Sequence, residues 1–178
     1  MRRLAVTVLT LLALASPAVA QNANPIELGL DGVLAVNLET PRSTSLVIPV
    51  QRLRAGFFVT PTISLEPALS LNRYSSNGSS STDLDFVAGA LFHLNPSRAS
   101  AQPYLRPFVE ILHRSFDGDV GGGSINTAVL GGGIGIKLPI ADRFAWRLEG
   151  AYSHVLERDR VPAQNILSAY FGFSFFTH

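Results

Sequence analysis

The segment that most invites a cofactor-binding interpretation is the glycine-rich run from Gly131 to Lys137. A phosphate-binding loop needs a glycine directly before the lysine and Ser or Thr directly after it, and Ile136 and Leu138 occupy those places. The dinucleotide-binding pattern also fails, because Ile136 stands where its third glycine is needed. The run therefore predicts a glycine-lined β-strand, and no cofactor site is expected.

Ser153 and His154, with Glu149 or Glu157, supply the residue types of a Ser/His/acid hydrolase. Adjacent residues of a strand point to opposite faces, so Ser153 and His154 cannot easily bond each other. The pattern of the outer-membrane lipid A deacylases is also missing. We therefore expect no catalytic residues and no enzymatic activity.

The histidines do not show the close spacing that metal ligands usually have. We expect no metal site, and interpret each histidine as a rim or interior residue that forms hydrogen bonds. The four are His93, His113, His154 and His178.

The first twenty residues predict a cleavable signal peptide. Arg2 and Arg3 form a short basic region, residues 4–15 are apolar, and Ala18-Val19-Ala20 gives a small-x-small cleavage pattern. The apolar run is shorter than the roughly 18 residues that a spanning helix needs. We therefore expect a signal peptide over residues 1–20 and one mature domain over residues 21–178.

Composition favours a membrane barrel for the mature chain. Two of the 14 Lys and Arg residues and none of the 13 Asp and Glu residues lie in the leader, so the mature chain carries a net charge of −1. Its basic residues are scattered, which argues against a nucleic-acid partner. Hydrophobic residues make up 47% of the chain and cysteine is absent, yet no mature stretch reads as a spanning helix. Barrels spread their apolar residues over alternate strand positions, which fits this composition.

The sequence pattern repeats every two residues, which predicts β-strands as the elements that position these side chains. Apolar residues alternate with small or polar ones over eight segments of roughly ten residues, the length of a tilted spanning strand. The segments are residues 26–36, 45–60, 63–73, 83–94, 104–114, 127–138, 143–156 and 165–176.

The connectors alternate between long and short. Longer polar loops are expected over residues 37–44, 74–82, 115–124 and 157–164, and tighter links over residues 61–62, 95–102 and 139–142. Bacterial barrels have short periplasmic turns and longer external loops, so both termini are predicted to be periplasmic. Because proline removes a ladder hydrogen bond, we expect Pro49 before its strand and bulges or rim positions at Pro67 and Pro107.

The polar face of these strands carries both signs of charge. An eight-stranded barrel has an interior just wide enough for side chains to fill, so charges there must pair or keep trapped water. The six acids and five bases predict a structural network that plugs the lumen. The eleven residues are Glu27, Asp31, Arg52, Arg54, Glu66, Asp85, Arg106, Glu110, Lys137, Arg147 and Glu149.

The opposite face is apolar, with Trp146, Tyr152 and residues 171–176 as candidates for an interfacial aromatic girdle. A soluble β-fold would use the same apolar residues for its core. The exposed face of such a fold would be mostly Lys, Glu, Thr and Ser. The polar face of these strands is instead rich in glycine and in charges of opposite sign. The all-β interpretation is therefore an eight-stranded, antiparallel, up-and-down transmembrane barrel.

Three strand segments carry a resemblance: Leu53 to Val59, Arg147 to Tyr152, and Ala169 to Phe176. They resemble the outer-membrane protein β-barrel domain family of OmpA/OmpX-like shape, over nearly all of residues 21–178. The resemblance implies a C-terminal signal for the barrel-assembly machinery. The chain departs from the family because Thr177 and His178 follow the last aromatic residue. The residues of this signal are Tyr170, Gly172, Phe173, Phe175 and Phe176.

The function expected from these patterns is a non-enzymatic barrel of the outer membrane. Its partners would be outer-membrane lipid, the barrel-assembly machinery during biogenesis, and an unidentified ligand or surface partner of the external loops. Three alternatives remain open: a small-solute channel, a lipid-active enzyme of the outer membrane, and a soluble periplasmic ligand-binding barrel.

Overall fold

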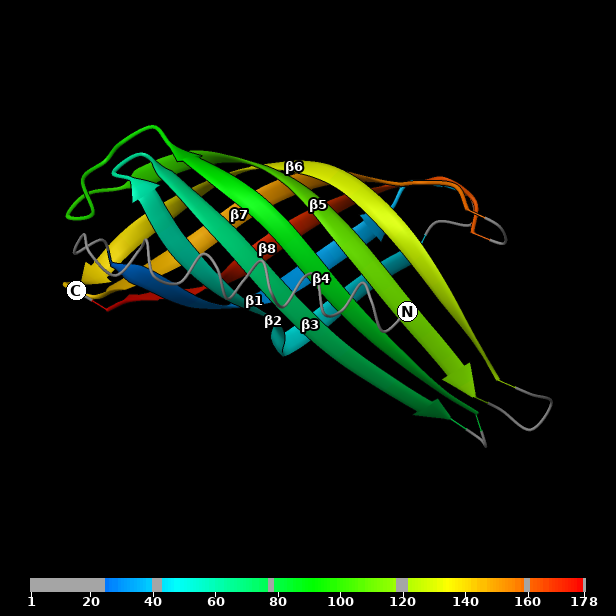
Figure 1. The fold of residues 1–178 in the computed structure, drawn as a ribbon. Helices are drawn as coiled ribbons and strands as arrows, with labels where there is room; N and C mark the ends of the chain where they lie inside the picture. Colours follow the sequence, from blue (N-terminus) through cyan, green and yellow to red (C-terminus); the bar gives the residue numbers. More distant parts are fainter. Residues whose placement is uncertain (1–24, 40–42, 77–78, 118–121, 159–160, 178) are drawn as a thin grey trace.

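The computed structural model is one antiparallel β-sheet closed into a barrel (Figure 1). It describes residues 25–39, 43–76, 79–117, 122–158 and 161–177. Each strand pairs with the next along the chain, and β1 closes the barrel by pairing with β8. The strands are β1 (Ile26–Asn37), β2 (Ser43–Thr60), β3 (Ile63–Ser76), β4 (Ser79–His93), β5 (Gln102–Asp117), β6 (Gly123–Ala141), β7 (Phe144–Val155) and β8 (Gln164–Phe176).

This architecture confirms the predicted fold class of an eight-stranded up-and-down barrel. The alternation of apolar and polar residues therefore reported the strands correctly. Across the described ranges, no helix is long and apolar enough to cross a membrane. The signal peptide predicted over residues 1–20 lies outside the described residues.

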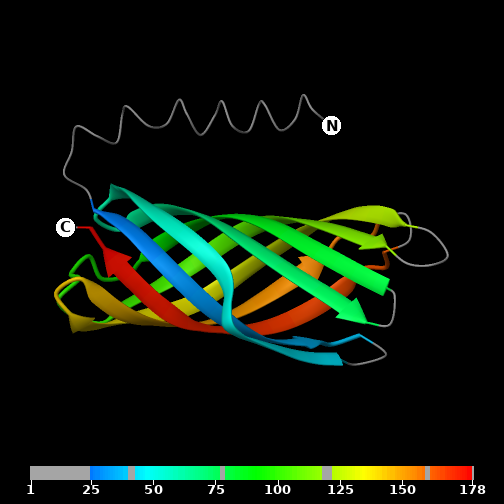
Figure 2. The same cartoon turned by 90° about the horizontal axis from the view of Figure 1, so that it is seen from below.

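The start of β1 and the end of β8 lie side by side at one end of the barrel (Figure 2). The backbone N–H of Thr177 donates to the carbonyl of Ile26 at 3.0 Å, and the Ile26 N–H donates to the Thr177 hydroxyl at 3.0 Å. The links of residues 61–62, 94–101 and 142–143 lie at this end. We call it the terminal end, and the opposite end the loop end.

The connectors do not alternate between long and short as regularly as predicted. Strands β3 and β4 run on until only residues 77–78 separate them, and β5 and β6 are separated by residues 118–122. At the terminal end, by contrast, the link of residues 94–101 is one of the longer ones. The expected loops of residues 74–82 and 115–124 are largely strand, because pairs such as Arg73 with Thr82 extend the ladder beyond the apolar stretch.

The proline expectations are wrong. Pro49 lies inside β2, where residues 48–51 oppose only Gly32 as the β1–β2 register shifts. Pro67 and Pro107 lie in mid-strand, paired with Ala88 and Gly132. Each proline also borders a second neighbouring strand, and the register with that strand is the same on both sides of the proline. For Pro67, the β2–β3 pairs Arg54–Ala68 and Phe57–Leu65 have the same register. The sheet tolerates the missing proline N–H as a local gap in one ladder.

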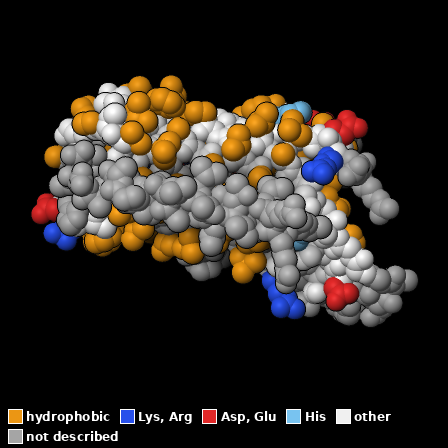
Figure 3. Space-filling model, in the orientation of Figure 1, with side chains coloured by type: hydrophobic (Ala, Val, Ile, Leu, Met, Phe, Trp, Pro, Cys, Tyr) orange, Lys and Arg blue, Asp and Glu red, His pale blue; other side chains and the backbone are white. Residues whose placement is uncertain are grey.

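The barrel is inside-out compared with a water-soluble domain. Among the described residues, 17 polar or charged residues are buried against 12 hydrophobic ones. Large apolar side chains are exposed along every strand, including Leu71 at 66% and Ile134 at 66%. On the face drawn in Figure 3, hydrophobic side chains spread along the barrel and the visible charges gather near its two ends. Such a surface suits hydrocarbon and not water.

Candidate functional site in the barrel lumen

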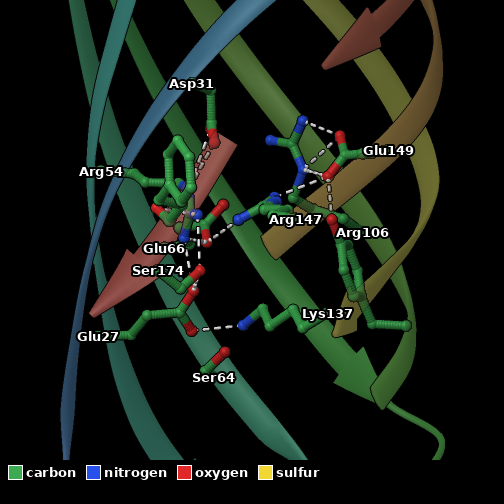
Figure 4. A network of polar contacts seen from close by, with 12 residues as sticks. Glu27, Asp31, Arg54, Ser64, Glu66, Arg106, Lys137, Arg147, Glu149 and Ser174 are labelled. Atoms are coloured by element: carbon green, nitrogen blue, oxygen red, sulfur yellow. Dashed lines mark hydrogen bonds and ion pairs between the residues drawn. The ribbon is translucent and has the colours of Figure 1, made fainter. Parts of the chain in front are cut away.

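Arg54 is the centre of the polar network in the lumen (Figure 4). Its Nη1 lies 2.5 Å from Glu27 Oε1 and 3.4 Å from Glu66 Oε2, and its Nε lies 2.9 Å from Asp31 Oδ2. Its Nη2 donates to the Ser174 hydroxyl at 2.8 Å. Alternation along β1, β2, β3 and β8 turns all these side chains inward. One guanidinium thus joins four strands.

A second branch crosses the lumen to β5 and β7. Arg147 Nη1 lies 2.5 Å from Glu66 Oε2, and its Nη2 lies 2.6 Å from Glu149 Oε2. Glu149 also accepts hydrogen bonds from Arg106 Nε at 2.9 Å and from the Tyr104 hydroxyl at 2.8 Å. Glu66 therefore links the two guanidinium groups of Arg54 and Arg147 from opposite walls.

Lys137 of β6 completes the connection by forming an ion pair with Glu27. The joined set, which we call the lumen network, takes charged side chains from six of the eight strands, and β8 contacts it through Ser174. It contains four carboxylates and four cations, so its formal charges cancel. They are Glu27, Asp31, Glu66, Glu149, Arg54, Arg106, Lys137 and Arg147.

Burial makes this balance necessary. Glu27 is 0% exposed, and Lys137 and Arg147 are each 1% exposed. Taking an ion out of water costs several kcal/mol, and good ion-pair geometry with further hydrogen bonds is needed to offset that cost. Matched charges thus fill this part of the lumen, and a small cluster of buried apolar side chains lies beside them, formed by Ala68, Val87, Phe108 and Ala151.

A smaller cluster lies towards the loop end. Arg52 Nη2 lies 3.3 Å from Glu110 Oε2, and its guanidinium sits 4.8 Å from the centre of the Tyr170 ring. The Ser70 hydroxyl donates to Asp85 Oδ2 at 2.8 Å. Nearer the rim, Asp83 binds Arg114 in a two-pronged ion pair of 2.7 Å, with half of the Arg114 side chain exposed. The charges therefore become better solvated towards the rim.

Aromatic rings fill the lumen at the terminal end. Phe58 stacks on the His93 ring with 5.3 Å between centroids and lies 6.5 Å from Phe176. Arg98, from the link of residues 94–101, places its guanidinium 4.9 Å above Phe58 and 5.7 Å from Phe176. Cation–π contacts of this kind stabilise a folded-over link. This link thus covers part of the mouth at that end.

Glycines on the inner face of β6 make room for the large side chains opposite. A Cβ at Gly135 would lie 2.3 Å from the Tyr104 hydroxyl, and one at Gly131 would lie 2.2 Å from the Phe108 ring. The run from Gly131 to Lys137 is accordingly a wall strand of the barrel. The space left by its glycines is occupied by aromatic rings and by Glu149 near Gly133.

All eleven charged residues singled out in the sequence point into the barrel. Ten are buried, and the Glu110 side chain is 15% exposed. Eight of them form the lumen network, while Arg52, Asp85 and Glu110 lie in the cluster towards the loop end. Sequence reasoning placed Ser70 and Ser174 on the polar face but missed Tyr104 and Gln102, because neither has a charge to signal an interior role. The only available signal was their inward position in the alternation.

The residues of the expected assembly signal divide between the two faces of β8. Phe173 and Phe175 face outward, where they pack against Trp146 and Phe144 with centroids 4.4 and 5.1 Å apart. Tyr170 faces the lumen near Arg52, and Gly172 is buried between Asp31 and Arg147. Phe176 is 4% exposed inside the mouth, so its expected place in the aromatic girdle is wrong. Phe175 and Phe176 are adjacent, and adjacent residues of a strand point to opposite faces of the sheet, so only Phe175 can face outward.

Each described histidine contacts a different polar side chain. His93 contacts the Ser64 hydroxyl at 3.2 Å, His113 contacts Asn126, and His154 contacts Asn165. His178 lies outside the described residues. Among the residues that the structure describes, no group of three His, Asp or Glu side chains is arranged to hold a metal ion.

Comparisons with known proteins place the chain by fold. The chain matches no protein-family model and no curated protein sequence. Among solved structures, Neisserial surface protein A has a TM-score of 0.66 at 13% identity, covering 84% of this chain and 96% of that one. The attachment invasion locus protein Ail of Yersinia pestis has a TM-score of 0.51 at 10% identity, covering 86% and 97%. The outer membrane protein OprG of Pseudomonas aeruginosa has a TM-score of 0.51 at 10% identity, covering 87% and 96%.

The fold is that of the small eight-stranded barrels seen in these outer-membrane proteins. At these identities the likeness concerns the fold and does not transfer an activity. The resemblance noted in the strand segments is thereby confirmed for the architecture.

Proposed function

We propose that this protein is a non-conducting barrel of the bacterial outer membrane, which anchors the connectors of its loop end at the cell surface. The observation that carries the proposal is the lumen network, because its buried ion pairs join six of the eight strands across the barrel. Export through a signal peptide over residues 1–20 and recognition of β8 by the barrel-assembly machinery belong to the same proposal.

The exterior supports a membrane location. Exposed Leu, Ile, Val and Phe side chains cover the middle of the strands, and Phe144, Trp146, Phe173 and Phe175 form an aromatic patch near the terminal end. Aromatic rings are enriched where hydrocarbon meets the head groups of a bilayer. In water, this surface would leave large contiguous apolar areas unprotected.

The positions of particular side chains argue against the alternatives. A solute channel needs an open lumen, whereas Arg54, Glu66 and Arg147 meet across this one at 3.4 and 2.5 Å. A soluble ligand-binding barrel would have an apolar interior, whereas the buried set here is mainly polar. A hydrolase of the Ser153 type would need His154 beside the serine, but that ring is held by Asn165.

The names of two solved neighbours support a role at the cell surface. One is described as a surface protein and another as an attachment invasion locus protein. A closed barrel would serve such a role as a rigid support for its external connectors.

Cell fractionation with gel electrophoresis tests the location. The protein should be enriched in the outer membrane, and unboiled samples should migrate differently from boiled ones because the closed barrel resists detergent. A soluble periplasmic protein with no boiling-dependent shift would contradict the proposal.

A further inference from the structure

A polar cluster stands on the outer wall of the barrel towards the loop end, separate from the lumen network. The Tyr152 hydroxyl donates to Asn165 Oδ1 at 2.5 Å, and Asn165 Nδ2 donates to Glu39 Oε1 at 2.8 Å. His154 Nδ1 lies 2.8 Å from the same Asn165 Oδ1. We call Glu39, Tyr152, His154 and Asn165 the outer cluster; it joins β7, β8 and the residues that follow β1.

The outer cluster supplies the first polar side chains on the outward faces of β7 and β8, while Leu38 and Leu156 stay exposed beside and beyond it. Going up β7, the outward residues Trp146, Leu148 and Gly150 lead to Tyr152 and then to His154. On β8, Leu167 is 47% exposed and the next outward position towards the loop end is Asn165. Outward polar side chains of this kind are expected where the hydrocarbon of a membrane gives way to lipid head groups.

An apolar furrow begins directly beneath the outer cluster. It has a volume of about 580 Å³ and runs over β5 to β8, with Tyr152 and Leu167 at its upper edge and Leu105 and Ile134 lower down. Its floor is formed by Gly132 and Gly150, where an added Cβ would meet no atom within 4 Å. The Tyr152 side chain thus belongs to the furrow through its ring and to the outer cluster through its hydroxyl.

The hydrogen-bond chemistry of the outer cluster selects the head group. Because Asn165 Nδ2 donates to a carboxylate, Asn165 Oδ1 is the acceptor, so His154 Nδ1 carries the proton of the neutral ring. His154 Nε2 is then an acceptor, and Glu39 contributes carboxylate oxygens. A cluster of acceptors with one negative charge matches hydroxyl donors and opposes a phosphate.

From the furrow and the outer cluster we infer a binding site for one saccharide-headed lipid of the outer leaflet. One acyl chain lies in the furrow over Gly132 and Gly150, and the sugar hydroxyls donate to His154 and Glu39. The apolar furrow faces hydrocarbon and the acceptors face the head-group layer, so both parts of one lipid meet complementary chemistry. The inference rests on the proposed membrane location.

Native mass spectrometry of the folded full chain released from detergent tests this site. The probes are monoglucosyl diacylglycerol and phosphatidylglycerol with identical chains. We expect the glycolipid to be retained about tenfold more strongly than phosphatidylglycerol. The furrow-filling variant Gly132→Leu/Gly150→Leu should lose that retention. Ala88→Leu, which adds bulk to the exposed face of β4, should keep it.

A second variant separates the head group from the chain. Asn165→Ala should remove the preference for glycolipid over phosphatidylglycerol, because Glu39 and His154 lose their common support. Equal glycolipid retention by the wild type and the furrow-filling variant would overturn the site, as would an unchanged preference in Asn165→Ala. Each sample is first checked for its boiling-dependent gel shift. A folded barrel without lipid selectivity rejects only this site, whereas failure to reach the outer membrane rejects the proposed function.

Discussion

Arg54 Nη1 lies 2.5 Å from Glu27 Oε1, and neither side chain has any exposed surface. Glu27 is held from the other side by Lys137, and Arg54 from its other edge by Asp31. Removal of the guanidinium would leave Glu27 and Asp31 underpaired in a closed space. The stability of the barrel should therefore depend strongly on this one cation.

Arg54→Met should lower the free energy of unfolding by about 3–5 kcal/mol, the usual cost of leaving a buried charge without its partner. Urea unfolding of protein inserted in phosphatidylcholine vesicles, followed by Trp146 fluorescence, measures this change. Arg143→Met is the matched control, because Arg143 is exposed in the link before β7. Equal losses in the two variants would show that Arg54 has no special role.

The coupling between Arg106 and Glu149 should exceed that between Arg114 and Asp83. The first pair is almost wholly buried, whereas the Arg114 side chain is 51% exposed. A double-mutant cycle with Arg106→Met and Glu149→Gln should give a coupling energy of about 1–3 kcal/mol. The corresponding cycle for Arg114 and Asp83 should give less than about 1 kcal/mol, because water screens an exposed pair. A larger coupling energy for the Arg114–Asp83 pair would argue against a lumen that excludes water.

Gly172 is required by the close approach of β8 to β1. A Cβ at this position would lie 2.0 Å from the carbonyl oxygen of Leu30. Gly172→Ala should cost about 1–3 kcal/mol or more, since backbone must shift. At Gly150 an added Cβ meets nothing within 4 Å, so Gly150→Ala should be close to neutral. Equilibrium unfolding of both variants decides the matter, and equal stabilities would contradict the β1–β8 register.

Trp146 should face lipid. It is the single tryptophan of the chain, is 43% exposed, and packs against Phe173 on the outer surface. Lipids with brominated chains should therefore quench its fluorescence strongly, and aqueous acrylamide should quench it weakly. Strong acrylamide quenching together with weak bromine quenching would mean that this face of β7 is exposed to water.

Alternation alone was enough to predict the eight strands and the inward direction of residues such as Arg147 and Glu149. A period of two fixes the face of a side chain but not its neighbour across the barrel, which depends on strand register. The contact of Glu66 with Arg147, 81 positions apart, therefore could not be predicted. The bulge at residues 48–51 could not be predicted either, because it arises from the register between β1 and β2. The same holds for Pro107, whose place inside β5 depends on a local gap in one ladder. The outer cluster was missed because Asn165 and Glu39 meet only when β8 closes on β1.

The central claim is that the lumen network closes the barrel, and single-channel recording in planar bilayers tests it most directly. The folded wild-type protein should give no steady conductance. The variant Glu66→Ala/Arg147→Ala/Glu149→Ala, checked by its gel shift, should give discrete steps because it removes side chains that cross the lumen. Steady conductance of the wild-type protein would contradict the account.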